Sequence, residues 1–119
     1  MSEEAMTSAH QTMRDLAEPA RELRAEIPEV IDGYATTQRA VMVDGALPAK
    51  VKELIALAIA ATRECDGCIA AHGRGAARAQ ATEAEVAEAM GVVVMMNGGP
   101  GTVWGPRAFA AYEEFSAEP

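Results

Sequence analysis

The sequence predicts an all-α, single-domain fold of about six helices, and three observations support this prediction. The chain has 119 residues, which is a length typical of one domain. Half of the residues are hydrophobic but only 4% are aromatic, and alanine, leucine, valine and methionine, several of them strong helix formers, supply most of the remainder. One helical segment follows another along the chain, with no internal repeat and no low-complexity linker.

The net charge of −8 argues against a nucleic-acid partner or an anionic membrane surface, since both attract basic faces. The longest apolar run, residues 54–61, is far shorter than a membrane span. The acidic start, residues 1–5, lacks the positive charge of a secretory signal. We therefore expect a cytoplasmic protein, where two cysteines indicate catalysis, redox chemistry or metal binding rather than a structural disulfide.

The first two helical segments are predicted at residues 6–24 and 29–42. Residues 1–25 are interpreted as an N-terminal helical arm and residues 26–119 as the main helical domain, with Pro19 expected to split or kink the first helix. Pro28 suits the start of the second helix, and Asp44-Gly45 its end. Its predicted inner stripe, in which Tyr34 is a core or interface residue, is Val30, Ile31, Tyr34, Ala35, Gln38 and Val41.

The third helix, starting with Pro48 at its first position and running to about residue 61, is the clearest. After Glu53 it is apolar on every side, which is typical of a helix buried all round, against the core on one side and a partner subunit on another. Glu53 is the exception. From composition alone it is an exposed residue that interacts with the helix dipole or with Lys50.

Three further helices are predicted at residues 65–79, 82–97 and 106–116. In the first, Gly73 and Gly75 weaken the helix or permit close approach by another chain. Thr82 and Glu85 form a capping-box pattern, and residues 97–101 are a tight turn. The expected packing residues are Val86, Met90, Val93, Val94, Met96, Phe109, Tyr112 and Phe115, with Trp104 filling a cavity or an interface.

The residues that carry chemistry are Cys65 and Cys68, the only cysteines, together with His72. Positions i and i+3 share one face of a helix, so the two sulfurs can form a reversible disulfide, and His72 lies one turn beyond Cys68. The thiolate is the reactive form of cysteine, and a neighbouring acid–base group activates it.

Other uses of these residues fit less well. Structural zinc needs four ligands from separated segments, whereas the remaining histidine, His10, is expected in a mobile N-terminal arm. Haem of the c type requires histidine directly after the second cysteine, where Ile69 stands. We therefore predict dithiol–disulfide chemistry without a metal. Cys65 lies nearer the helix start, but Cys68 lies within reach of His72, which favours Cys68 as the attacking thiol and Cys65 as the resolving thiol.

Residues 53–58, the Cys-x-x-Cys and His72 together resemble the signature of the alkylhydroperoxidase D-like (AhpD-like) branch of the carboxymuconolactone decarboxylase family. The spacing Glu-x11-Cys-x2-Cys-x3-His is specific, and the resemblance extends from about residue 48 to the last helix. It implies an all-helical fold that assembles as a homo-oligomer, a trimer or hexamer. It also implies that Glu53 and His72 form a proton relay that deprotonates a cysteine, which replaces the exposed interpretation of Glu53.

The resemblance further implies a thiol-dependent peroxidase that reduces a hydroperoxide in antioxidant defence, with no bound cofactor. An external dithiol of the lipoamide type, or a peroxiredoxin, would return the disulfide to the dithiol. The chain departs from the family pattern in two places: Asp66-Gly67 stands where some members carry a relay histidine, and Gln80 stands where many have a helix-ending glycine.

Two alternatives remain open at this point. One is a decarboxylase-like enzyme acting on a small organic acid, with His72 and Glu53 as acid–base groups. The other is a non-enzymatic subunit in which the disulfide switches an oligomer interface.

Overall fold

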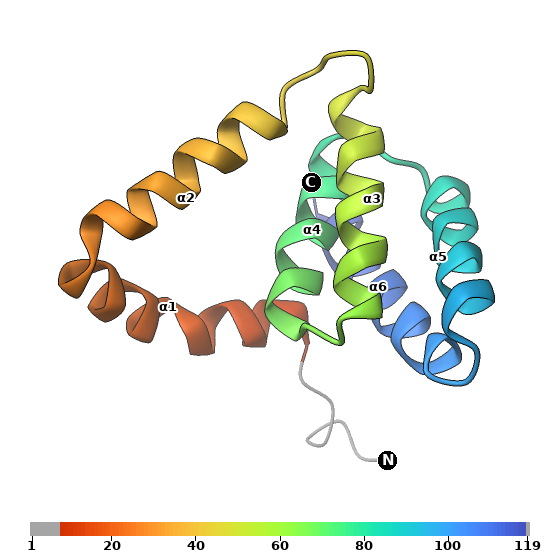
Figure 1. The fold of residues 1–119 in the computed structure, drawn as a ribbon. Helices are drawn as coiled ribbons and strands as arrows, with labels where there is room; N and C mark the ends of the chain where they lie inside the picture. The colour runs from red at the N-terminus through yellow and green to blue at the C-terminus, as the bar shows by residue number, and fades with distance from the viewer. Residues whose placement is uncertain (1–7, 119) are drawn as a thin grey trace.

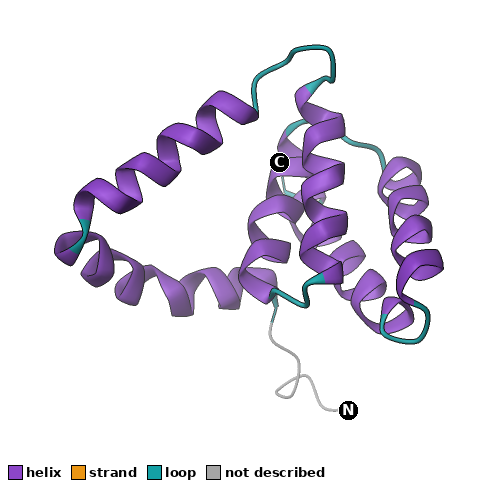
Figure 2. Ribbon diagram, in the orientation of Figure 1, coloured by secondary structure: helices purple, strands orange, loops and turns teal. Residues whose placement is uncertain are grey.

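The computed structural model describes residues 8–118, and this part of the chain contains six helices and no strand (Figure 2). The predicted all-α fold is therefore confirmed. None of the described helices is long and apolar enough to cross a membrane. The helices are α1 (Ala9–Glu26), α2 (Pro28–Val41), α3 (Ala49–Thr62), α4 (Asp66–Arg78), α5 (Glu83–Asn97) and α6 (Gly101–Ser116).

Helices α3 to α6 pack into a bundle, whereas α1 and α2 form a V whose point is directed away from the bundle (Figure 1). Helix α4 lies in the middle of the structure, because it packs on α3, on α6 and on α1. The core is built from alanines and a few larger side chains, of which Leu57 and Val86 are fully buried. Tyr112 and Phe115 are buried as predicted, and the Tyr112 hydroxyl donates to the Ala81 carbonyl at 2.6 Å.

Two predictions about α1 and α2 can be compared with the structure. Pro19 lies inside α1 without interrupting it, because a proline removes only one backbone hydrogen bond and this helix has solvent on most sides. Helix α2 has no buried residue, and Tyr34 is 67% exposed, so it is not a core residue; its prediction as an interface residue stays open. Among residues 8–118, most of the apolar stripe of α2 is left uncovered. Met6 lies outside the described residues.

Two other helices also expose apolar side chains. In α3, Ile55 and Ile59 are 45% and 54% exposed, so this helix is not buried all round within one chain. In α5, Val86, Met90 and Val93 are buried as predicted, but Val94 and Met96 face outward. An apolar helix side that its own subunit leaves uncovered cannot be told from a core side by hydrophobicity alone.

Several helix ends follow the sequence signals. Pro28 is the first residue of α2. The capping box is confirmed, because the Glu85 amide donates to the Thr82 hydroxyl at 3.1 Å and the Thr82 amide donates to the Glu85 carboxylate at 2.8 Å. The amide of Thr82 and then Lys50, which lies 2.9 Å from Glu85, hold the pKa of the Glu85 carboxyl below its usual value. Pro48 is the N-cap of α3 rather than its first residue.

The last helix begins at Gly101, five residues before the predicted start at Pro106. Pro100 is the N-cap of this helix, and its carbonyl accepts hydrogen bonds from the amides of Val103 and Trp104. A Cβ at Gly101 would lie only 2.8 Å from the Val93 carbonyl oxygen, so glycine allows α6 to turn back tightly onto α5. Pro106 is then tolerated inside the helix, as Pro19 is in α1.

Gln80 forms the turn that ends α4, at a position where the sequence resemblance leads us to expect glycine. Its φ is +64°, in the left-handed region that glycine adopts most easily, and its amide donates to the Ala77 carbonyl. The turn after α4 is therefore made by a strained glutamine.

The start of α1 is fixed to the end of α6 by one carboxylate, contrary to the expectation that His10 lies in a mobile arm. Glu114 accepts hydrogen bonds from the amides of Ala9 and His10 and from His10 Nδ1 at 2.7 Å. The His10 ring also stacks on Phe115, with centroids 4.4 Å apart. The hydrogen bond to Glu114, followed by Glu118, raises the pKa of His10 above its ordinary value.

This anchor predicts a pH dependence of stability. The pKa of His10 is higher in the folded state than in the unfolded state. The contribution of His10 to the free energy of unfolding is therefore fully present below the unfolded-state pKa of about 6.5, and it is lost as the pH rises through the folded-state pKa. We expect the melting temperature to fall more steeply between about pH 6 and pH 8 in the wild type than in His10→Gln. Thermal unfolding followed by circular dichroism measures both slopes, and parallel curves would contradict the anchor.

Candidate dithiol site

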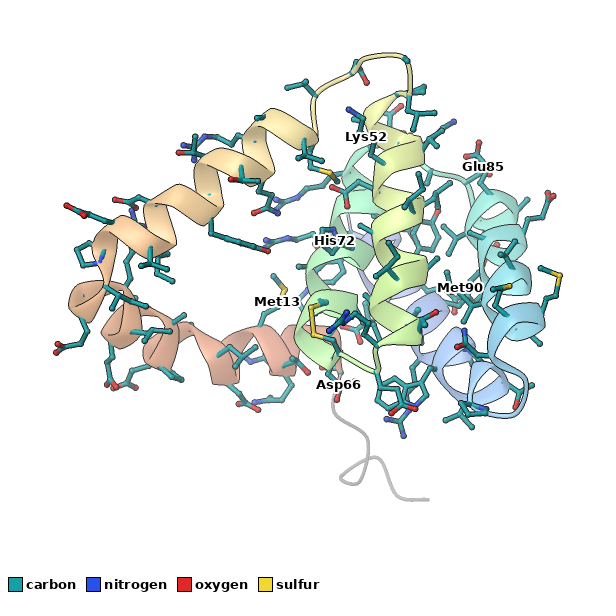
Figure 3. The ribbon with its side chains drawn as sticks, viewed as in Figure 1. Met13, Lys52, Asp66, His72, Glu85 and Met90 are labelled. Atoms are coloured by element: carbon teal, nitrogen blue, oxygen red, sulfur yellow. A yellow bond between two sulfur atoms is a disulfide. The ribbon has the colours of Figure 1, made fainter. Side chains whose placement is uncertain are left out.

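The two cysteines lie at the N-terminal end of α4, where they form a disulfide with Cα atoms 5.3 Å apart (Figure 3). Cys65 is the N-cap residue, and its sulfur accepts a hydrogen bond from the Cys68 amide at 3.2 Å. The positive end of the helix dipole favours negative charge at this position. Cys68 is exposed and Cys65 is half-buried, so the first sulfur is held by the helix end and the second faces outward.

The turn between α3 and α4, just before the cysteines, determines which residues of α3 lie opposite α4. Glu64 has φ of +55°, which ends α3 in a left-handed turn, and the Cys65 amide bonds back to the Ala60 carbonyl at 3.1 Å. Helix α4 therefore folds back against α3 and packs beside it (Figure 1). This arrangement brings Glu53, near the start of α3, opposite His72, which lies in the second turn of α4 (Figure 3).

Glu53 and His72 form a hydrogen-bonded pair. The distance from His72 Nδ1 to Glu53 Oε2 is 2.9 Å, and the side chains are only 19% and 15% exposed. An ionised carboxylate only accepts hydrogen bonds, so Nδ1 carries the proton in this contact. In the neutral ring, Nε2 is then the nitrogen with a free lone pair. The pair therefore fixes which ring nitrogen can act as a base.

Gly75 makes room for this pair. A Cβ built on Gly75 would overlap the whole carboxylate group of Glu53. By contrast, a Cβ on Gly91 of α5 would meet nothing within 4 Å. The absence of a side chain at position 75 is thus a steric requirement for Glu53 to reach His72, whereas the glycine at position 91 has no such role.

Two other glycines bring helices of the same chain close to the site. At Gly73 a Cβ would lie 3.1 Å from the Ala111 Cβ and from the Tyr112 amide nitrogen, so glycine lets α6 pack tightly on α4. At Gly67, between the two cysteines, a Cβ would lie 3.2 Å from a methyl carbon of Leu16. Helix α1 therefore crosses the dithiol turn at short distance.

The structure brings together Glu53, His72 and the helix that carries both cysteines. Within residues 8–118, no hydrogen bond joins His72 to either sulfur of the disulfide. Lys50, the partner expected for an exposed Glu53, pairs with Glu85 instead. No group of three or more His, Cys, Asp or Glu side chains in the described part of the chain could hold a metal ion.

Sequence reasoning did not identify Gly75 or Leu16 as part of the site. The sequence predicts for Gly75 only a weakened helix or a close approach by another chain, because it does not show that position 75 faces position 53 on another helix. The signal that could have found it is geometric: residues 72 and 75 lie on one face of α4, so the side chain that reaches His72 also passes over position 75.

With this geometry established, comparisons with known proteins agree on the family. The sequence model of the carboxymuconolactone decarboxylase family matches residues 28–114. The crystal structure of apo-lpg0406, a carboxymuconolactone decarboxylase family protein from Legionella pneumophila, is similar to this chain with a TM-score of 0.86 and 38% sequence identity. The similarity covers 91% of this chain and 96% of that one. The chain belongs to the carboxymuconolactone decarboxylase family.

Curated relatives carry no functional description. An uncharacterized protein of Cupriavidus necator is 37% identical over 90 residues, which cover 76% of this chain and 80% of the relative. Uncharacterized protein 4 in the cox locus of Paracoccus denitrificans is 35% identical over 83 residues, covering 70% and 75% of the two chains. The function of this chain must therefore be argued from its own site.

Proposed function

We propose that this protein is a thiol-dependent peroxidase that cycles between the Cys65–Cys68 disulfide and the dithiol, as the alkylhydroperoxidase D-like branch of the family does. The observation that carries the proposal is the pairing of Glu53 with His72 on the helix that also bears both cysteines. A dithiol alone would serve many purposes. A carboxylate-oriented histidine one turn from an exposed thiol supports activation of that thiol.

In the first step, His72 Nε2 accepts the proton of the Cys68 thiol, while Glu53 holds the ring and stabilises the imidazolium that forms. The Cys68 thiolate attacks the outer oxygen of a hydroperoxide, the O–O bond breaks, and the alcohol leaves after taking a proton. The sulfur becomes a sulfenic acid. Cys68 suits this role because its side chain is exposed and lies one helical turn from His72.

In the second step, the Cys65 thiol condenses with the sulfenic acid, releasing water and forming the disulfide. The amide of Cys68 and the N-terminal end of α4 stabilise a thiolate on Cys65, which favours both its attack on the sulfenic acid and its departure when the disulfide is reduced. An external dithiol, of the lipoamide type or from a peroxiredoxin, then exchanges with the disulfide and is itself oxidised.

The direct test is hydroperoxide consumption by the pre-reduced protein with dihydrolipoamide as reductant. Cys65→Ser and Cys68→Ser are expected to abolish turnover, since each removes one sulfur of the cycle. Glu53→Gln is expected to slow turnover by about 100-fold, the usual scale of general acid–base assistance. Glu88→Gln, which changes an exposed carboxylate of α5, is the matched control and should keep wild-type turnover.

Other outcomes would replace the proposal. Formation of one disulfide per chain followed by arrest would mean a redox switch without catalysis. Activity on a small organic acid that survives loss of both sulfurs would mean a decarboxylase-like enzyme using Glu53 and His72.

We also infer that the subunit assembles with further copies of itself, as a trimer or hexamer. Apolar side chains uncovered in one chain occur on α2, α3 and α5, including Tyr34, Ile59 and Met95, which are 67%, 54% and 73% exposed. Exposed large apolar side chains on several helices are a reason to look for a subunit interface. Light scattering on the purified protein should give a mass of three or six chains, and a monomer at micromolar concentration would contradict the assembly.

A further inference from the structure

A second hollow lies where α1, α4 and α6 meet, and it shares no lining residue with the dithiol site. It consists of two adjoining, solvent-open depressions of about 330 and 270 Å³, so it has room only for a small ligand. Arg74, Arg78, Phe115 and Glu118 line both cavities. His10, Met13, Arg14 and Ala17 complete the larger cavity, and Ala77 completes the smaller one.

The hollow gathers positive charge in an acidic chain. Arg74 and Arg78 are four residues apart on α4, so they project from the same face. Arg14 reaches the hollow from α1. Within residues 8–118, none of these three arginines forms an ion pair with a carboxylate, although the sequence has 18 acidic residues. Three arginines from two helices therefore line one hollow, and Glu118 is the one carboxylate among the described residues of its lining.

The acidic groups beside the hollow are engaged elsewhere. Glu118 lines it, and Glu114 lies next to it on α6; both carboxylates bond to the His10 ring. Glu114 also accepts the amides of Ala9 and His10. Their negative charge is thus directed at His10 and the start of α1. The three arginines outnumber these two carboxylates, and His10 adds a fourth positive charge when protonated.

The remaining lining is apolar. Phe115 is 8% exposed and Met13 packs against the core, while Ala17 and Ala77 are small and leave space above them. An apolar wall beside a guanidinium pair suits a ligand with an anionic head and a hydrophobic body. The guanidinium group of an arginine can donate two parallel hydrogen bonds to the two oxygens of a carboxylate, which fixes the orientation of the ligand and increases its affinity.

We propose that this hollow binds a small organic carboxylate, with its head group on Arg74 and Arg78 and its apolar chain or ring against Phe115 and Met13. The site is distinct from the dithiol, so it gives the protein a second ligand, independent of the hydroperoxide.

The test uses octanoate as the probe, with 1-octanol as the neutral match of equal chain length. Amide chemical shifts of the isotope-labelled, full-length protein are followed by NMR during titration. Octanoate should cause saturable shifts in residues lining the hollow, with octanol much weaker. Arg74→Gln/Arg78→Gln should weaken octanoate binding by at least about tenfold, because two charge-assisted contacts are lost. Arg21→Gln, on an exposed position of α1 outside the hollow, should bind like the wild type.

Three results would overturn the site: no saturable shifts with octanoate, equal binding of octanol, or undiminished binding by the double variant. Unchanged circular dichroism of the double variant confirms that a loss of binding is not a loss of fold. Arg74→Lys in the same titration should bind octanoate with intermediate affinity, since it keeps the charge but loses the planar fork. Because none of the lining residues belongs to the dithiol machinery, failure here leaves the peroxidase proposal standing, and the reverse also holds.

Discussion

The hydrogen bond between Glu53 and His72 is the interaction on which the interpretation of the site depends. It joins α3 to α4, and, with an ionised Glu53 as the acceptor, it places the proton of a neutral His72 ring on Nδ1 and leaves the lone pair on Nε2. The left-handed turn at Glu64 brings the two helices side by side, and the missing side chain at Gly75 leaves the space that the Glu53 carboxylate occupies. Backbone geometry and one missing methyl group thus favour the position of the pair on which the proposed activation of Cys68 depends.

Helix α4 combines structural and chemical roles along its length. Its first turn carries the cysteines, its second carries His72, and Gly73 and Gly75 follow at once so that α6 and Glu53 can approach. Its last turn carries Arg78 toward the hollow beside α1. Small residues on this helix cost helix stability, because glycine is a poor helix former. Packing on three neighbouring helices offsets that cost and keeps the site on a rigid element.

Local signals in the sequence predicted most of the helices and the family, but not the relations between distant residues. The capping box at Thr82 and Glu85 and the Cys-x-x-Cys disulfide depend on neighbours within a few residues, and both are found in the structure. The predicted buried side of α5 is found only in part, because Val94 and Met96 are exposed. The predicted start of α6 was wrong, because Pro106 lies inside this helix and does not mark its boundary. The exposure of α2 could not be predicted, since its apolar stripe resembles a core stripe. The role of Gly75 was not predicted, because the side chain for which it makes room, Glu53, lies 22 positions earlier in the sequence.

The most direct measurement is the pH dependence of Cys68 alkylation by iodoacetamide, made in a Cys65→Ser background so that only one thiol reacts. If the Glu53–His72 pair activates Cys68, Gly75→Ala should displace the Glu53 carboxylate and slow alkylation at neutral pH by about tenfold, while the helix keeps its fold because alanine favours helices. Gly91→Ala, which adds the same methyl group in open space, should react like its parent. Identical pH profiles for all three proteins would contradict the account, because Cys68 would then ionise without help from the pair.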